Sequence, residues 1–168
     1  MATDTYYFDG SDAAASDPDS AWTDETNADD GNVATLASTA TNGSESSNYL
    51  QIEGTNSPSS GGAITQVRAR VNTGSSFLAY STLSAPAGGW TWEKLQGLEF
   101  RAWKEASGPG SGSFLKWYED GNAGSTSLGS YIYGGSPQIS KVEIEVTSSS
   151  SGTVQGISTI QGITSITL

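Results

Sequence analysis

Residues 139–146 read Ile-Ser-Lys-Val-Glu-Ile-Glu-Val, the clearest alternation of apolar and charged residues in the chain. Successive side chains of a β-strand point to opposite faces of a sheet, so this alternation predicts a half-buried strand. The apolar face is predicted to pack on a core and the charged face to point outward. The inward set is Val142, Ile144 and Val146, and the outward set is Lys141, Glu143 and Glu145.

The same period of two recurs at 63–71 and at 98–104. Asp9-Gly10 is a turn signal, so the first strand is predicted to be a short edge strand that ends there. Residues 90–95 predict either a short helical turn or a loop. Runs rich in β-branched and aromatic residues predict further strands at 5–8, 33–37, 49–52, 76–83, 114–118 and 130–133. With 21 glycines available for turns, the sequence predicts an all-β fold, an antiparallel β-sandwich of jelly-roll type.

At 168 residues the chain suits one domain, and 1–168 is predicted to form a single β-sandwich domain. Residues 1–48 are acidic and predicted to be rich in loops, with Trp22 as an anchor. Residues 152–168 carry no charge and are rich in Ile, Thr and Ser, which favours a β-strand. An unpaired strand of this kind aggregates. We therefore expect it to pair within the domain or, as an assembly arm, with a neighbouring subunit.

The chain contains no cysteine and no histidine. This excludes disulfides, thiolate zinc sites, Ser-His-Asp triads and imidazole ligands. Eighteen acidic residues against seven basic ones give a net charge of −11, so we expect no nucleic-acid partner. No segment approaches the ~20 apolar residues that cross a bilayer, and no signal peptide is evident. We therefore expect no membrane partner and synthesis inside a cell.

The stretch 24–32 is rich in carboxylate and amide oxygens, the ligands that Ca²⁺ prefers. Its spacing differs from that of the helix-loop-helix calcium loop, and Asp, Asn and Gly also favour turns for backbone reasons. A structural cation site and a plain solvated loop are therefore both open. The predicted cation ligands are Asp24, Asn27, Asp29 and Asp30.

Glu143 and Glu145 lie two residues apart on a predicted strand and therefore share a face. Paired carboxylates serve glycoside hydrolysis when they line a cleft. They are equally typical of a polar outer face, here shared with Lys141, and we favour that interpretation. No residue is predicted to be catalytic. Three scattered arginines are predicted to pair with acidic side chains at the surface or at an interface: Arg68, Arg70 and Arg101.

Aromatic residues gather in the second half of the chain. Side chains of this kind either form a platform on which sugars stack or fill the core and the subunit interfaces. We expect most of them to be core or interface. The aromatic residues concerned are Trp90, Trp92, Trp103, Trp117, Tyr118, Tyr131 and Tyr133.

Three stretches carry a resemblance to a known group of proteins. They are Asp-Pro-Asp-Ser-Ala-Trp-Thr at 17–23 with Ala-Asp-Asp-Gly-Asn at 28–32, the stretch from Ala-Pro-Ala-Gly-Gly-Trp-Thr-Trp to Glu-Phe at 85–100, and 139–146. Together they resemble the jelly-roll-like structural modules of tailed-virus particles. In such modules the middle stretch is a Trp-bearing turn that leads into a core strand, and the last is the closing strand. The Gly/Ser-rich segment 107–113 and the tail depart from this pattern.

The resemblance covers about residues 17–146 and brings no catalytic residue with it. It implies a non-enzymatic virion structural protein: a capsid decoration, turret, tail or fibre component that assembles in the host cytoplasm. Its expected partners are other virion proteins, such as the major capsid protein, and further copies of itself. The alternative is a carbohydrate-binding or adhesin module with a host-surface glycan as ligand. A glycosidase or lyase on the same fold is the third interpretation.

Overall fold

The computed structural model describes residues 1–13, 22–44, 46–74, 76–104, 113–119, 122–132 and 138–149. The predicted tail strand at 152–168 lies outside the described residues, so the assembly arm stays a prediction. The strands are β1 (Ala2–Ala13), β2 (Trp22–Thr23), β3 (Ala37–Thr39), β4 (Leu50–Thr55), β5 (Ile64–Asn72), β6 (Ser81–Thr82), β7 (Leu98–Lys104), β8 (Ser113–Glu119), β9 (Asn122–Ile132), β10 (Gln138–Ile139) and β11 (Lys141–Ser148). The helices are the 3-10 helix η1 (Glu25–Ala28) and α1 (Trp92–Gln96).

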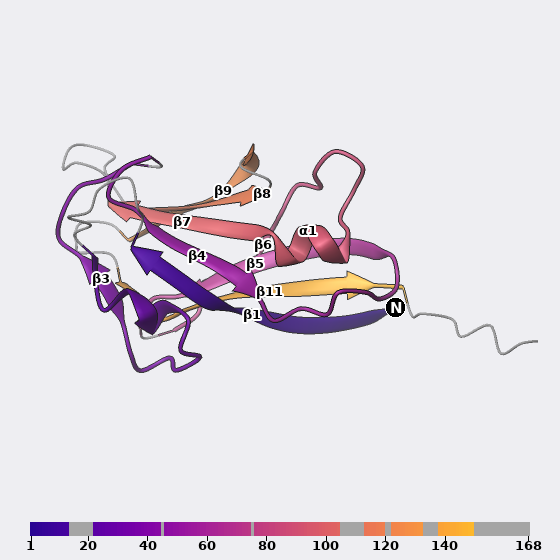
Figure 1. Cartoon of the computed structure of the whole chain (residues 1–168), viewed down its shortest axis with the longest axis horizontal. Coiled ribbons are helices and arrows are strands. Elements are labelled where there is room, and N and C mark those ends of the chain that lie inside the picture. The colour runs from indigo at the N-terminus through magenta and orange to yellow at the C-terminus, as the bar shows by residue number, and fades with distance from the viewer. Residues whose placement is uncertain are drawn as a thin grey trace, which may run out of the picture.

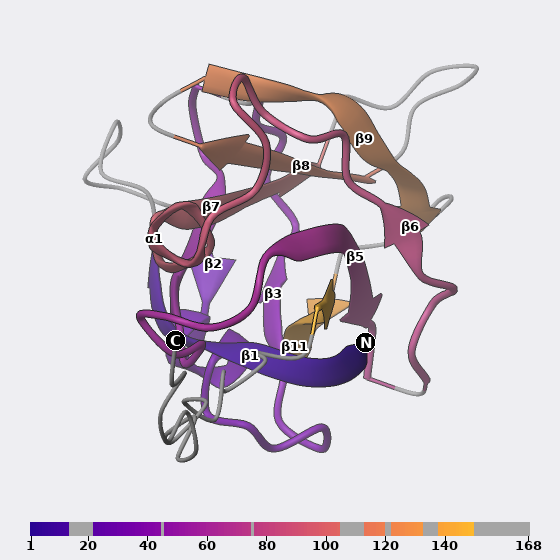
Figure 2. The ribbon, with the colours of Figure 1, turned by 90° about the vertical axis from the view of Figure 1, so that its right-hand side faces the viewer.

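Eight of these strands form one sheet in the order β6-β5-β11-β1-β4-β7-β8-β9, and β10, β3 and β2 form a smaller sheet. Every pairing between the named strands is antiparallel. The large sheet curls, so that β7, β8 and β9 lie across the interior from β1, β11 and β5 (Figures 1 and 2). The all-β antiparallel class is therefore confirmed, whereas the β-sandwich of jelly-roll type stays a prediction.

Strand β1 differs from the short edge strand that the sequence predicted. It runs for 12 residues without turning at Asp9-Gly10, and it lies between two other strands. Its first half, from Ala2 to Tyr7, pairs with β11, and its second half, from Phe8 to Ala13, pairs with β4. A Cβ atom on Gly10 would lie 3.0 Å from the backbone oxygen of Glu53. The glycine therefore permits close approach of β4 where a turn was expected.

Two other predicted strands are displaced or shortened. At 33–37 the chain forms turns, because Asp30 accepts a hydrogen bond from the amide of Asn32 (2.7 Å) and Asn32 accepts one from the amide of Ala34 (3.0 Å); β3 begins only at Ala37. Of the predicted strand 76–83, only β6 forms.

The three alternating stretches behave as predicted. The inward residues of β5, β7 and β11 are almost fully buried and pack with aromatic residues from β1 and β8. Phe8 of β1 and Phe100 of β7 meet edge to face, with ring centroids 5.1 Å apart. The buried inward residues of these three strands are Val67, Ala69, Val71, Leu98, Phe100, Ala102, Val142, Ile144 and Val146.

Helix α1 resolves the ambiguity at 90–95 in favour of a helical turn and lies beside one end of the curled sheet (Figure 2). Thr91 caps it, because its hydroxyl accepts a hydrogen bond from the amide of Lys94 (3.2 Å). Thr55 at the end of β4 donates to the carbonyl of Leu95 (3.1 Å), which ties the helix to the sheet. Within the described residues, no helix is long and apolar enough to span a membrane.

The core of this sheet predicts a large loss of stability for Ile144→Ala. Ile144 is fully buried on β11, which has strands on both sides. We expect urea denaturation to show an unfolding free energy lower by about 2–5 kcal/mol, from lost burial and from the cavity left behind. Val33→Ala is the control, because Val33 is 44% exposed and its truncation is expected to stay within ~0.5 kcal/mol. Equal effects of the two truncations would contradict this core.

Candidate functional site

The charged side chains of β5 and β11 lie side by side on the face of the sheet that points away from the core. In the strand register, Glu143 stands between Tyr7 and Arg70, and Glu145 stands opposite Arg68. The connection between β5 and β6 adds two aromatic rings above them. We call this surface the outer face, and its members are Tyr7, Arg68, Arg70, Phe77, Tyr80, Lys141, Glu143 and Glu145.

Ion pairs hold the charges of the outer face in place. Arg70 donates from Nε (2.9 Å) and Nη2 (2.7 Å) to Oε2 of Glu143, while Lys141 Nζ lies 3.1 Å from Oε1 of the same carboxylate. Both oxygens of Glu143 are therefore engaged, and its side chain is only 10% exposed. The predicted outward direction of Glu143, together with Lys141, is confirmed.

The second carboxylate of the predicted pair is engaged in the same way. Arg68 donates from Nε to Oε1 of Glu145 (2.8 Å), and its Nη2 contacts the same oxygen. The predicted role of Arg68 and Arg70 as pairing residues is confirmed. Each glutamate faces an arginine on the neighbouring strand, so the two form an ion-paired surface.

Aromatic rings cover the basic groups. The guanidinium carbon of Arg70 lies 4.0 Å from the ring centroid of Phe77 and 4.5 Å from that of Tyr80. Arg68 lies 4.9 Å from the Tyr80 centroid, and Lys141 Nζ lies 4.9 Å from the centroid of Tyr7. Over 76–83, where only a short strand forms, the aromatic residues thus fold over the arginines in cation–π contacts.

Arg101 repeats the arrangement on β7. Its Nε donates to Glu99 (2.5 Å), and its guanidinium carbon lies 4.6 Å from the Tyr49 ring centroid. Tyr49 in turn packs with the buried Trp103 in a small cluster separate from the main core. The prediction that Arg101 pairs with an acidic side chain is therefore confirmed.

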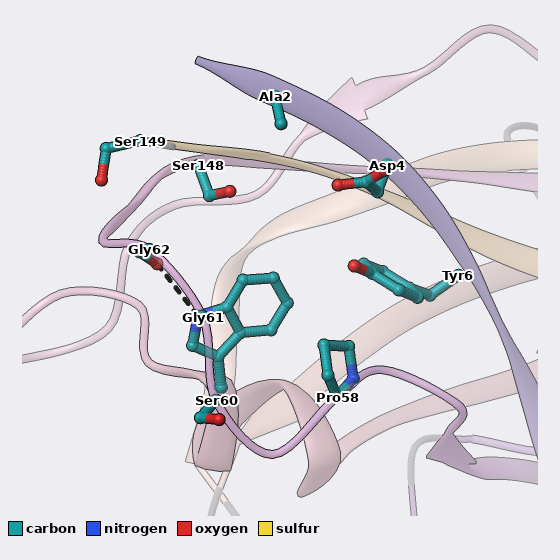
Figure 3. A pocket seen from close by; sticks show the side chains of 10 residues that line it. Ala2, Asp4, Tyr6, Pro58, Ser60, Gly61, Gly62, Ser148 and Ser149 are labelled. Carbon is teal, nitrogen blue, oxygen red and sulfur yellow. Dashed lines mark hydrogen bonds between the residues drawn. The ribbon is translucent and has the colours of Figure 1, made fainter. Parts of the chain in front are cut away.

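A pocket of about 230 Å³ opens where the inward face of β1 reaches its N-terminal end (Figure 3). Tyr6 and Trp92 meet there almost at right angles, with ring centroids 6.1 Å apart. The indole of Trp92 is fixed because its Nε1–H donates to the carbonyl of Gly62 (2.9 Å). Burial, and next the charge of Asp4, raise the pKa of Tyr6 above its usual value. The lining residues are Ala2, Asp4, Tyr6, Pro58, Ser60, Gly61, Gly62, Trp92, Ser148 and Ser149.

Sequence reasoning missed this pocket for an identifiable reason. It began the first strand at residue 5 and so left Asp4 outside the sheet. The sequence did contain a signal for it. Asp4, Tyr6 and the buried Phe8 are spaced two residues apart, so they lie on the same face of the strand. Among the other predicted platform residues whose side chains are described, Trp90, Trp103 and Trp117 are buried, as expected of core. The side chains of Tyr118 and Tyr131, and all of Tyr133, lie outside the described part.

The four predicted cation ligands lie in and around η1. Asp24 precedes the helix with a left-handed backbone (φ 55°), and the side-chain Nδ2 of Asn27 donates to the carbonyl of Leu36 (3.1 Å). The second carboxylate oxygen of Asp30 accepts from the Thr35 hydroxyl (2.5 Å). In the described stretches, no group of three or more acidic residues is placed to hold a metal ion. Calcium binding by Asp24, Asn27, Asp29 and Asp30 stays a prediction.

No protein-family model, curated protein or solved structure matches the chain. The resemblance of 17–146 to virion modules therefore stays a prediction. The outer face and the pocket are the two features from which a function can be proposed.

The outer face predicts that Glu143→Gln destabilises the fold. The substitution removes the charge that Arg70 and Lys141 share, and it leaves both cations partly buried without that charge. We expect the unfolding free energy to fall by about 1–3 kcal/mol in urea denaturation. Glu53→Gln is the matched control, because Glu53 is exposed and a glutamine can still accept the hydrogen bond from Gln51. A loss no greater than that of the control would contradict a structural role for Glu143.

Proposed function

We propose that this chain is a non-enzymatic structural protein of a virus particle that works by contacting other protein subunits through the outer face. The observation that carries the proposal is that arginines on this face are held by aromatic rings and by carboxylates. Tyrosine and arginine are the residue types enriched at protein–protein interfaces and at their energetic centres.

The basic side chains of the outer face are already held in place in the free protein, which favours such a contact. Long basic side chains usually lose rotamer freedom when an interface forms, which costs roughly 0.5–1.5 kcal/mol for each. Glutamates and aromatic rings already hold Arg68 and Arg70 in the free protein. Most of their rotamer freedom is therefore lost when the chain folds, before any partner binds. Tyr7 adds an aromatic ring that is 39% exposed at the margin of the face.

The charges of the outer face indicate the kind of partner surface that would bind it. The outer face carries three basic residues, Arg68, Arg70 and Lys141, against the two carboxylates of Glu143 and Glu145, so it has an excess of one positive charge in a chain of net charge −11. The first 48 residues contain ten carboxylates (Asp4, Asp9, Asp12, Asp17, Asp19, Asp24, Glu25, Asp29, Asp30 and Glu45) and no Lys or Arg. We therefore propose that the outer face of one copy meets the acidic N-terminal third of the next. Opposite charges then steer association and fix its orientation.

This head-to-tail contact suits a component that repeats over a particle, such as a capsid decoration, turret, tail or fibre protein. The major capsid protein is the further partner that the sequence resemblance implies. The second candidate function is a carbohydrate-binding or adhesin module. One observation favours it: Trp92 is half-buried beside a pocket, where a glycan could meet its ring.

The proposal predicts salt-dependent self-association that depends on Tyr7. We expect size-exclusion chromatography with light scattering to show oligomers at about 0.05 M salt and smaller species at about 1 M, because salt screens the contact. Tyr7→Ser should weaken association roughly tenfold or more, the loss typical of an interface hot spot.

Tyr7→Phe is the control, because it keeps the ring over Lys141 and should associate like the parent. Thermal unfolding should be alike for both variants. A parent chain that stays monomeric at low salt, or a Tyr7→Ser variant that associates normally, would overturn this contact.

A further inference from the structure

We infer that the pocket lined by Asp4, Tyr6 and Trp92 is a binding site for an organic ammonium group, of the kind carried by choline-like molecules and by methylated lysine. It lies on the inward side of β1, so it is separate from the outer face. The inference goes beyond the proposed subunit contact and does not depend on it.

Basic side chains of the described structure are held in two ways: Lys94 and Lys104 donate to backbone carbonyls, and the others combine a carboxylate with aromatic rings. Four basic side chains each stand between a carboxylate and at least one aromatic ring. The four sets are Arg70 with Glu143, Phe77 and Tyr80; Arg68 with Glu145 and Tyr80; Lys141 with Glu143 and Tyr7; and Arg101 with Glu99 and Tyr49.

The pocket has the same two parts. Asp4 provides the carboxylate, and Tyr6 and Trp92 provide two rings. Of the described residues that line the pocket, none is Lys or Arg. Within the described part, no hydrogen bond or ion pair engages the Asp4 carboxylate, which Figure 3 shows near the Tyr6 hydroxyl.

The rings are arranged in advance of binding. They stand at 88° to one another, so they form two walls of a corner. Trp92 is held at its Nε1 by Gly62, and a Cβ atom on Gly61 would lie 2.6 Å from the indole ring. The backbone thus packs directly on the indole, whose ring type gives the strongest cation–π attraction.

Size and charge point to the same ligand class. About 230 Å³ is many times the space that one water needs, which leaves room for a trimethylammonium head. The net charge of −11 attracts cations and repels anions such as phosphates and acidic sugars. A neutral sugar can stack on a ring and donate hydroxyl hydrogen bonds to Asp4, but an ammonium group carries a full charge that attracts both the carboxylate and the ring faces.

The test is a titration followed by two-dimensional amide NMR, with choline as the probe. We expect shifts at the Trp92 indole N–H and at the amides of Gly61 and Gly62, with a Kd on the order of 1 mM. The dimethylbutanol in which carbon replaces the nitrogen of choline has nearly the same shape without the charge. It should bind at least tenfold more weakly, since both the rings and Asp4 then lose their attraction.

Asp4→Asn should weaken choline binding roughly tenfold and leave the fold intact, because Asp4 is exposed and makes no ion pair within the described residues. Asp9→Asn is the matched control on the same strand but outside the pocket lining, and it should bind like the parent. The inference is overturned if choline shifts none of the three signals, if the neutral alcohol binds equally well, or if both variants lose binding alike. Shifts with methyl glucoside but not with choline would also overturn it, in favour of a glycan site.

Discussion

Strand β1 forms hydrogen bonds with two different strands along its length, and the arrangement of the large sheet depends on this division. From Ala2 to Tyr7 it pairs with β11, and from Phe8 it pairs with β4. Among the described strands, those on the β11 side and those on the β4 side are joined in the sheet order only through β1. Phe8 lies where the partner of β1 changes, and it packs edge to face on Phe100 of β7 in the interior of the curl.

The same strand places the two candidate functional features on opposite faces. Odd-numbered residues such as Tyr7 point to the outer face, where they meet the ion pairs of β11 and β5. Even-numbered residues point inward: Phe8 is fully buried, Tyr6 is partly buried, and Asp4 reaches the open end of the interior. The pocket is thus the end of the core, where apolar residues give way to a carboxylate and to serines. A polar contact surface and a small-molecule site can coexist here because the two faces of a strand vary independently.

The sequence predicted what period-two alternation encodes. It identified β5, β7 and β11 with their inward residues, and it identified the arginine pairing. It did not predict the continuation of β1 past Asp9-Gly10, because a glycine in close contact with Glu53 looks the same in sequence as a glycine in a turn. It also predicted a strand at 76–83, where Phe77 and Tyr80 instead fold over Arg70 of β5. This contact depends on the three-dimensional fold, so the local pattern of residues does not reveal it. The pocket was missed because it needs the loop at 58–62, α1 and Asp4 together, and these meet only in three dimensions.

Native-state amide hydrogen exchange along β1 tests the dependence on this strand most directly. If β1 joins the two parts of the sheet, its amides bonded to β11 and those bonded to β4 should both exchange at the free energy of global unfolding, together with the amides of Val142, Ile144 and Val146. Exchange of the Ala2–Tyr7 amides at a free energy far below that of β11 would contradict this. The first half of β1 would then open alone, and neither the outer face nor the pocket would be held by the sheet.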